Sequence, residues 1–312
     1  MRTGRLNLEL SSLESEARKI NNAGQVVGHS FYEVLWQPDG SLMPLASLNG
    51  GYESVNVRSL NDSGIMVGTF NDTNNSFPVL WRADGQAEAL PGGPGYVTDV
   101  NNQGVAVGVL FPYTTVRWEP DGRMTGLDNL PGGSSATPFA LNNIGQAVGW
   151  AALPEGVAGV APVIWQSSGA VRRLPNEFPF TTTGQASDIN DNGLVVGFVR
   201  GVDPPSIAVQ WDSNQNDRLS ELVPEPGSGD STTAQAANNL GQVLISSWPR
   251  GWYLYGDGLF VPLADLIDGP NGWTDLYAAD INDSGTVVGT GRLGGIRRAF
   301  VMTPTERFYA RR

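Results

Sequence analysis

A short pattern first appears in the chain as Ile20-Asn21-Asn22-Ala23-Gly24-Gln25-Val26-Val27-Gly28. It returns as Leu60-Asn61-Asp62-Ser63-Gly64-Ile65-Met66-Val67-Gly68 and then five more times, with a degraded copy around Asn238. The recurring Asn occupies positions 21, 61, 101, 142, 190, 238 and 282, so the spacings are 40, 40, 41, 48, 48 and 44 residues. Seven copies at this period indicate one structural unit repeated along the chain.

A second motif follows each copy, first as Val34-Leu35-Trp36 with Asp39-Gly40 behind it. The aromatic residue of this motif recurs as Trp36, Trp81, Trp118, Trp165 and Trp211, and is replaced by Tyr255 and Met302 in the last two copies. Runs of β-branched and aromatic residues separated by Asn-x-x-Gly and Asp-Gly are typical of β-hairpins. Each unit therefore offers about four short strands, the content of one β-propeller blade.

The two ends of the chain complement each other. Residues 4–10 align with the strand that follows Asp-Gly, whereas the last copy ends soon after its third strand at Met302. We therefore expect one all-β domain over residues 1–312, a seven-bladed β-propeller of four-stranded antiparallel blades. The blade repeats would begin near residues 16, 56, 96, 137, 185, 233 and 277. Closure by the N-terminal strand removes two open sheet edges, although the tail 305–312 is an alternative partner for that edge.

Composition excludes several classes of function. The net charge is −12 and Lys19 is the single lysine, so neither nucleic acid nor an anionic membrane is an expected partner. The chain has no cysteine and one histidine, which leaves no disulfide, thiolate or His-rich metal site. No run of 18 apolar residues and no apolar signal core after Met1 is present. We expect a monomer without metal or cofactor.

The pattern Ala-x-Asp-Ile-Asn-x-x-Gly-x-Val-Val-Gly, followed by a strand such as Leu35-Trp36-x-x-x-Gly40, covers nearly the whole chain. It resembles the repeat of the HAF family, a bacterial and extracellular family. The resemblance implies a propeller-like β fold and an extracellular location. It implies no catalytic residue, because none is attached to the repeat, and fold alone does not determine function.

Blade topology sorts the connections onto two faces. The Asn-x-x-Gly and Asp-Gly turns, short in nearly every copy, are expected together on one face, which we call the turn face. The longer and more variable connections open on the opposite face, the loop face. Because ligand sites in repeat folds favour the face that carries the variable segments, we expect the site on the loop face.

Aromatic and charged residues concentrate in these variable connections. Such a surface suits a small molecule or a glycan; alternatively, the long loops fold over and bury their own aromatic residues. The predicted ligand-binding residues are Tyr32, Tyr113, Trp150, Arg200, Trp248, Trp252, Trp273, Tyr277 and Arg292.

Three residues are candidates for acid–base chemistry: His29, Glu33 and Asp275. His29 is the only side chain whose ordinary pKa lies near neutrality, and a carboxylate from another blade could serve as its partner. His29 could equally be an ordinary loop residue. A further set, Asp99, Asp188 and Asp280, either lines the central channel beside Lys19 or hydrogen-bonds neighbouring turns.

Three functions are compatible with these observations. The first is a binding propeller that holds a small molecule or glycan on the loop face. The second is a lyase, hydrolase or isomerase/cyclase whose acid–base residues come from several blades at the channel mouth. The third is a structural or protein-interaction repeat protein.

Overall fold

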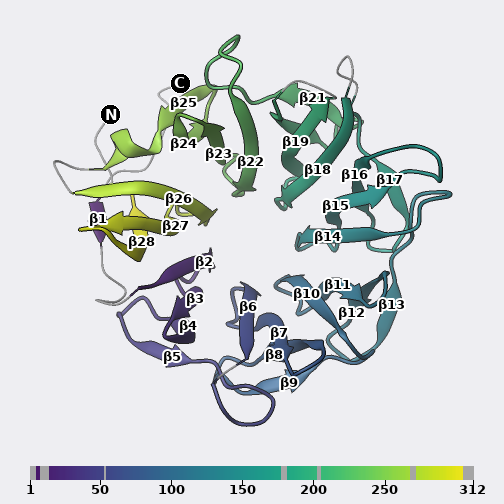
Figure 1. Cartoon of the computed structure of the whole chain (residues 1–312), viewed down its shortest axis with the longest axis vertical. Coiled ribbons are helices and arrows are strands. Elements are labelled where there is room, and N and C mark those ends of the chain that lie inside the picture. Colours follow the sequence, from purple (N-terminus) through teal and green to yellow (C-terminus); the bar gives the residue numbers. More distant parts are fainter. Residues whose placement is uncertain are drawn as a thin grey trace.

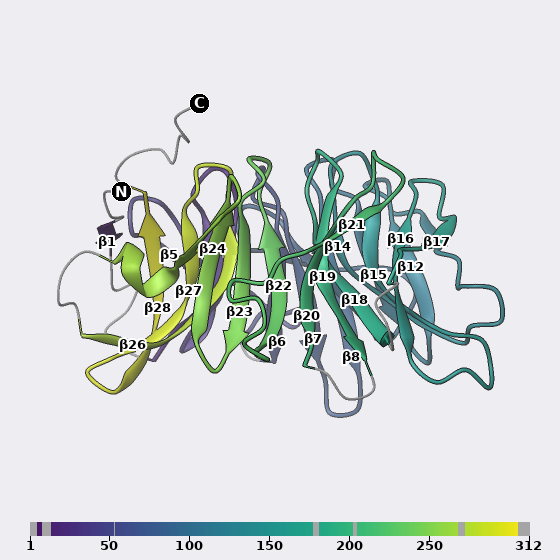
Figure 2. The same cartoon turned by 90° about the horizontal axis from the view of Figure 1, so that it is seen from above.

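Seven four-stranded antiparallel sheets are arranged in a closed ring around a central axis (Figure 1). The computed structural model describes residues 5–7, 14–52, 54–176, 181–201, 205–267 and 272–304. The chain is a seven-bladed all-β propeller, as its repeats predict. Figure 2 shows the blades side by side in a flat ring. No helix among these residues is long and apolar enough to cross a membrane.

In each of blades 1–6, four consecutive strands run from the channel outward. Blade 1 comprises β2 (Glu16–Ile20), β3 (Val26–Ser30), β4 (Tyr32–Trp36) and β5 (Leu42–Pro44). Blade 2 comprises β6 (Val55–Leu60), β7 (Met66–Asn71), β8 (Ser76–Trp81) and β9 (Ala87–Ala89). Blade 3 comprises β10 (Gly95–Val100), β11 (Ala106–Leu110), β12 (Thr114–Trp118) and β13 (Met124–Gly126). Blade 4 comprises β14 (Ala136–Leu141), β15 (Ala147–Ala152), β16 (Val160–Trp165) and β17 (Val171–Arg173).

The remaining blades are longer. Blade 5 comprises β18 (Thr181–Ile189), β19 (Leu194–Gly201), β20 (Ile207–Asp212) and β21 (Arg218–Glu221). Blade 6 comprises β22 (Ser231–Ala237), β23 (Val243–Trp248), β24 (Gly251–Gly256) and β25 (Leu259–Pro262), followed by the 3-10 helix η1 (Leu263–Leu266). Blade 7 comprises β26 (Trp273–Ile281), β27 (Val287–Leu293), β28 (Ile296–Thr303) and, as its outer strand, β1 (Arg5–Asn7).

The N-terminal strand closes the ring. β1 pairs antiparallel with β28, with Arg5 opposite Thr303 and Asn7 opposite Val301. This register confirms the predicted closure and satisfies a sheet edge that would otherwise be open. The tail 305–312, considered above as an alternative partner for this edge, lies outside the described residues.

Two glycines of the repeat have separate steric causes, shown by blade 1. Gly24 ends the Asn-x-x-Gly turn with φ +79°, a conformation that favours glycine. Gly28 lies on β3 against the inner strand, where an added Cβ would come within 1.9 Å of the Glu16 carbonyl oxygen. The second glycine therefore lets the two strands approach closely.

The recurring tryptophans form the packing between blades. Trp36, Trp81, Trp118, Trp165 and Trp211 are all fully buried. In four of them the indole Nε1 donates to a backbone carbonyl of the connection from the preceding blade, at 2.5–2.8 Å. Each of these tryptophans thus fills the space between two sheets and satisfies its only polar atom there.

The recurring asparagines tie all seven blades into a closed ring. The side-chain Nδ2 of each donates to the backbone carbonyl of the equivalent Asn in the next blade, at 2.8–3.2 Å, and Asn282 returns to Asn21. Each Oδ1 accepts the amide four residues ahead in its own turn, at 2.8–3.0 Å. These side chains are buried, so water cannot replace their hydrogen bonds. Each Asn therefore holds its own turn and the adjacent blade in place.

We expect Asn101→Ala to destabilise the fold by about 2–4 kcal/mol, because it leaves the buried Val105 amide without its acceptor and removes the hydrogen bond to the next blade at the Asn142 carbonyl, which keeps only the Gly145 amide. Urea unfolding monitored by tryptophan fluorescence measures this loss. The adjacent residue gives a matched control, because the side chain of Asn102 bonds to Asp62 on the exposed rim. Asn102→Ala should cost about 1 kcal/mol or less. Equal losses for the two variants would contradict the structural role of the inner Asn ring.

Candidate functional site

Every inner strand carries a β-bulge three residues before its recurring Asn, which we call the ring Asn. The pairing register shifts there in all seven blades, for example between Ala17 and Lys19 in β2. The extra residue is Arg18, Arg58, Thr98, Phe139, Ser187, Gln235 and Ala279 in blades 1 to 7, and we call these seven the bulge residues. A bulge re-aims side chains, and all seven of these line one cavity.

This cavity, the channel cavity, occupies the loop-face end of the central channel and has a volume of about 560 Å³. Besides the bulge residues it is lined by residues of the same inner strands, chiefly Glu16, Tyr96, Thr137, Gln185 and Tyr277. Lys19 lies at its inner end, because Lys19 also lines the smaller cavity at the turn face. Residues from all seven blades thus meet at one place.

The lining differs from one side of the channel to the other. Blades 1 and 2 contribute the cationic side chains Arg18 and Arg58, with Glu16 beside them. Blades 3 to 6 contribute neutral side chains that combine hydrogen-bonding groups with aromatic surface: Tyr96, Thr98, Thr137, Phe139, Gln185, Ser187 and Gln235. Such a lining can orient a ligand that has two chemically different ends.

A buried carboxylate holds Arg18 in place. Glu33 is 4 % exposed and forms an ion pair with the Arg18 guanidinium. The same carboxylate accepts the Val57 amide at 3.0 Å, and the Val57 carbonyl accepts Arg18 Nη1 at 3.2 Å. The Glu33 carboxylate also contacts His29 Nδ1 at 3.1 Å. Glu33 therefore links blade 1 to blade 2 and positions Arg18 at the cavity wall.

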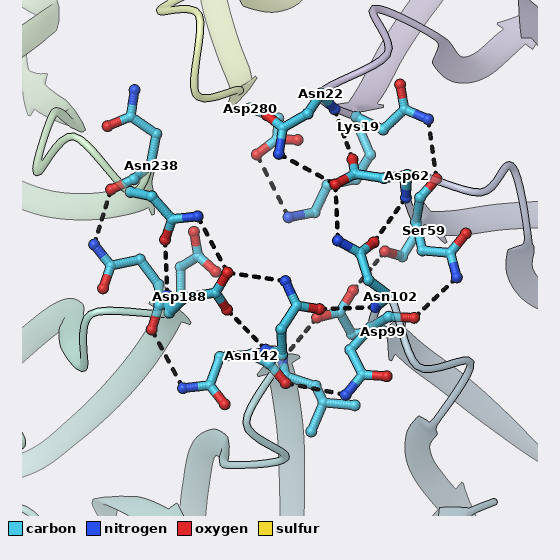
Figure 3. Close-up of a pocket in the computed structure, with 18 of the residues that line it drawn as sticks. Lys19, Asn22, Ser59, Asp62, Asp99, Asn102, Asn142, Asp188, Asn238 and Asp280 are labelled. Atoms are coloured by element: carbon cyan, nitrogen blue, oxygen red, sulfur yellow. Dashed lines mark hydrogen bonds and ion pairs between the residues drawn. The ribbon is translucent and has the colours of Figure 1, made fainter. Parts of the chain in front are cut away.

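At the inner end of the cavity, Lys19 faces three aspartates (Figure 3). Its Nζ lies 3.4 Å from Asp280 Oδ1. Each aspartate also accepts a backbone amide from the next blade: Asp280 that of Ile20, Asp99 that of Leu141 and Asp188 that of Ala237, at 2.7–2.9 Å. Both sequence interpretations of these aspartates hold, because they line the channel near Lys19 and they also bond to neighbouring blades.

Burial dominates the ionisation of this cluster. It raises the pKa of Asp280 to about 6, although Lys19 and the Ile20 amide act in the opposite direction. Burial also raises the pKa of Asp99. For Lys19, burial alone would lower the pKa, but the charges of Asp280, Asp188 and Asp99 outweigh it and raise the pKa above its usual value. The lysine therefore stays protonated at neutral pH.

A second ring of side chains surrounds the turn-face mouth: Asn22, Asp62, Asn102, Asn143, Asp191, Asn239 and Asp283. Each backbone amide donates to the side-chain Oδ1 of the next member, at 2.8–2.9 Å around the full circle. Every aspartate lies between two asparagines, so like charges are never adjacent, and the odd number of blades leaves one Asn–Asn junction at Asn102 and Asn143. This rim is satisfied by its own hydrogen bonds.

Of the residues predicted to bind a ligand, Tyr277 lines the channel cavity. The others are spread over the blades at the loop face. Trp252 packs edge-on against Tyr277 at 5.1 Å, and Trp273 packs against Phe300 at 6.0 Å, both partly buried. Tyr32 packs between Phe31 and Tyr52. Tyr113, Trp248 and Arg200 are exposed, whereas Trp150 is half-buried. Burial by neighbouring side chains therefore applies to some of these residues and not to others.

The predicted catalytic residues do not form one group. His29 and Glu33 are in contact, but neither lines the channel cavity. Asp275 instead pairs with Arg292 at 3.4 Å. In the part of the chain that the structure describes, no group of three or more metal-ligating side chains is present. A catalytic role for His29, Glu33 and Asp275 stays a prediction.

Sequence reasoning missed the bulge residues. The ligand site was expected in the variable connections, and within the repeat only Asp99, Asp188 and Asp280 were considered as channel residues. Yet the position three residues before the ring Asn holds Arg, Arg, Thr, Phe, Ser, Gln and Ala in the seven copies. A position that varies so widely inside an otherwise regular strand is the signal that could have identified them.

No protein-family model and no curated protein matches this chain. Solved structures match it across the fold. "YCF48 bound to D1 peptide" has a TM-score of 0.60 and 10% identity, covering 99% of this chain and 100% of that one. An acylaminoacyl peptidase from Pyrococcus horikoshii has a TM-score of 0.56 and 10% identity over 94% of this chain and 52% of that one. A puromycin hydrolase has a TM-score of 0.50 and 15% identity, covering 82% of this chain and 54% of that one. At these identities the similarity shows the propeller fold alone.

We expect the stability difference between the wild type and Asp280→Asn to depend on pH. The native state holds the Asp280 proton more tightly than the unfolded chain does, so ionisation costs the wild type stability as pH rises from about 4 to about 6. The Asn variant keeps an acceptor for the Ile20 amide and should gain about 3 kcal/mol relative to the wild type across this window. Urea unfolding at several pH values measures it.

Asp121→Asn is the control for this titration. The hydrogen bond from Arg123 lowers the pKa of the exposed Asp121, so the stability difference for that variant should change with pH in the opposite direction. If the stability difference between the wild type and Asp280→Asn did not change between pH 4 and pH 7, the expected cost of ionising the buried Asp280 would be wrong.

Glu33→Ala should destabilise the protein by about 2–4 kcal/mol, because it leaves Arg18 and the Val57 amide without their buried partner. His29→Ala should change stability by less than about 0.5 kcal/mol, since the imidazole is half-exposed and makes one contact. Thermal and urea unfolding of the two variants check this contrast. A loss as large for His29→Ala as for Glu33→Ala would show that the histidine has a structural role.

Proposed function

We propose that this chain is a binding propeller that holds a small molecule, such as a glycan fragment or a metabolite, in the channel cavity. The observation that carries the proposal is the set of seven β-bulges, which bring one variable side chain from every blade into a single space. The ring, the turns and the tryptophans repeat almost unchanged, whereas this position differs in nearly every blade. A variable position inside an otherwise regular repeat strand, facing one shared space, favours recognition there.

The size and chemistry of the cavity support the same proposal. A volume of about 560 Å³ lies within the range of about 300–1,000 Å³ usual for small-molecule sites. Tyr96, Phe139 and Tyr277 provide aromatic surface, and the Thr, Ser and Gln side chains provide hydrogen bonds. The inner strands are held by sheet pairing and by the Asn ring, so the site is largely formed before a ligand arrives.

Two parts of the proposal rest on resemblance. The repeats resemble those of the extracellular HAF family, and an extracellular receptor for small molecules would agree with that family's location. The similar YCF48 structure is bound to D1 peptide, and a short peptide is therefore one ligand to include in a screen. A catalytic role for His29, Glu33 and Asp275 would need turnover of a compound found in that screen.

The test is a thermal-shift screen of the full chain against glycans, organic acids, short peptides and aromatic metabolites. A ligand at 100 times its dissociation constant stabilises the fold by about 2.7 kcal/mol, which raises the unfolding midpoint by a few degrees. Ala279→Trp fills the cavity from β26 and should abolish each such shift. Thr125→Trp places the same side chain on the exposed outer strand β13 and should leave the shifts unchanged.

Shifts that survive in Ala279→Trp would place the ligand outside the channel cavity and contradict the proposal. For any compound that passes, product formation measured with the wild type and with His29→Ala separates a binding protein from an enzyme.

A further inference from the structure

The two ends of the channel carry opposite charge among the described residues. The turn-face cavity is lined by six carboxylates, those of Asp62, Asp99, Asp188, Asp191, Asp280 and Asp283, and by the amine of Lys19. The channel cavity at the loop face is lined by three cations, Arg18, Lys19 and Arg58, and by one carboxylate, that of Glu16. A cationic lining stands out in a chain whose net charge is −12.

The charge expected of the ligand is inferred from Arg58. It projects from β6 between the buried residues Val57 and Ser59, so its backbone is fixed while its side chain is exposed. Within the described residues, Arg58 has no ion pair and no hydrogen bond. Two other exposed arginines, Arg82 and Arg123, are each paired with a carboxylate. The Arg58 guanidinium is therefore available to a ligand.

The other charges around the cavity are already engaged. Glu16 pairs with Arg297 at 3.3 Å and with Arg18 at 3.7 Å, so the one carboxylate of the lining is neutralised. Arg18 is held by Glu33 and by the Val57 carbonyl, which keeps its guanidinium at the same side of the channel as Arg58. Lys19 faces its three aspartates at the inner end.

The opposite side of the cavity is neutral. Phe139 lies on β14, Gln185 and Ser187 on β18, and Gln235 on β22. These side chains supply an apolar face and hydrogen-bonding groups without charge. A ligand that spans the channel would meet cations at one end and a neutral surface at the other.

From this arrangement we propose that the ligand of the channel cavity is a small organic anion, with its carboxylate or phosphate group on Arg58 and its neutral body against Phe139 and the Gln side chains. The inference rests on the proposed function and adds the chemical class of the ligand. A guanidinium presents parallel N–H groups that match the oxygens of either anion, and binding would supply the counter-ion that no described residue gives Arg58.

The test compares four probes that share one ring and differ in charge: benzoate, phenyl phosphate, benzamide and benzylamine. Ligand-detected NMR and calorimetric titration of the full chain measure their affinities. We expect at least one anion to bind about 10-fold or more tightly than benzamide, and benzylamine to bind more weakly still. The order of benzoate and phenyl phosphate tells which anionic group the site prefers.

Arg58→Gln should lower the affinity for the anion by about 10-fold to 100-fold, because a charged hydrogen bond is lost, and should bring it to the level of benzamide. Arg58→Lys should keep part of the affinity, since it retains the charge without the fork of donors. Arg123→Gln, which removes an exposed arginine from the turn face, is the matched control and should bind as the wild type does. Unfolding midpoints equal to that of the wild type establish that these variants fold.

Three results would overturn the inference. The first is benzamide or benzylamine binding as tightly as the anions, and the second is anion binding that Arg58→Gln does not change. The third is no binding of any of the four probes. If neutral compounds of the wider screen still bind and Ala279→Trp abolishes their binding, the proposed function stands without the anion. If nothing in the screen binds, both are wrong.

Discussion

The whole structure depends on a closed circle of buried amide hydrogen bonds. Seven asparagines each donate to the next blade and accept from their own turn, and the circle is complete only because Asn282 returns to Asn21. A buried amide without a partner is costly, so each blade is held in a fixed position relative to its neighbours. The tryptophans between the blades add apolar packing to this arrangement, but they do not close it.

The same ring creates the channel and determines what can enter it. Because the ring Asn anchors each inner strand at the turn face, the bulge three residues earlier falls at one level of the channel in every blade. The ring Asn, which holds the fold together, and the variable bulge residue are therefore only three positions apart in the sequence. The fold can keep its hydrogen bonds unchanged and still vary the seven side chains that face a ligand.

Lys19 separates two environments of opposite charge. The three aspartates that accept backbone amides from the next blades would repel one another without a cation among them, and Lys19 provides it. Their cost is visible in the raised pKa of Asp280, where burial exceeds the attraction of the lysine. These carboxylates are engaged at the turn face. At the loop-face end, Arg18 is paired with Glu33, and Arg58 is the lining cation that no described carboxylate pairs.

Local repetition was enough to predict the seven blades, their strands, the turn face and the loop face, and the closure by β1. Turn residues and alternating apolar residues act over a few positions, so each copy of the repeat reveals them. The channel cavity was not predictable in this way. Its lining comes from strands about 40 residues apart, and a single-residue bulge decides which side chains point inward. Only the closed ring brings Arg58, Phe139 and Gln235 to one cavity, because their proximity is set by the seven-fold geometry and not by their order along the chain.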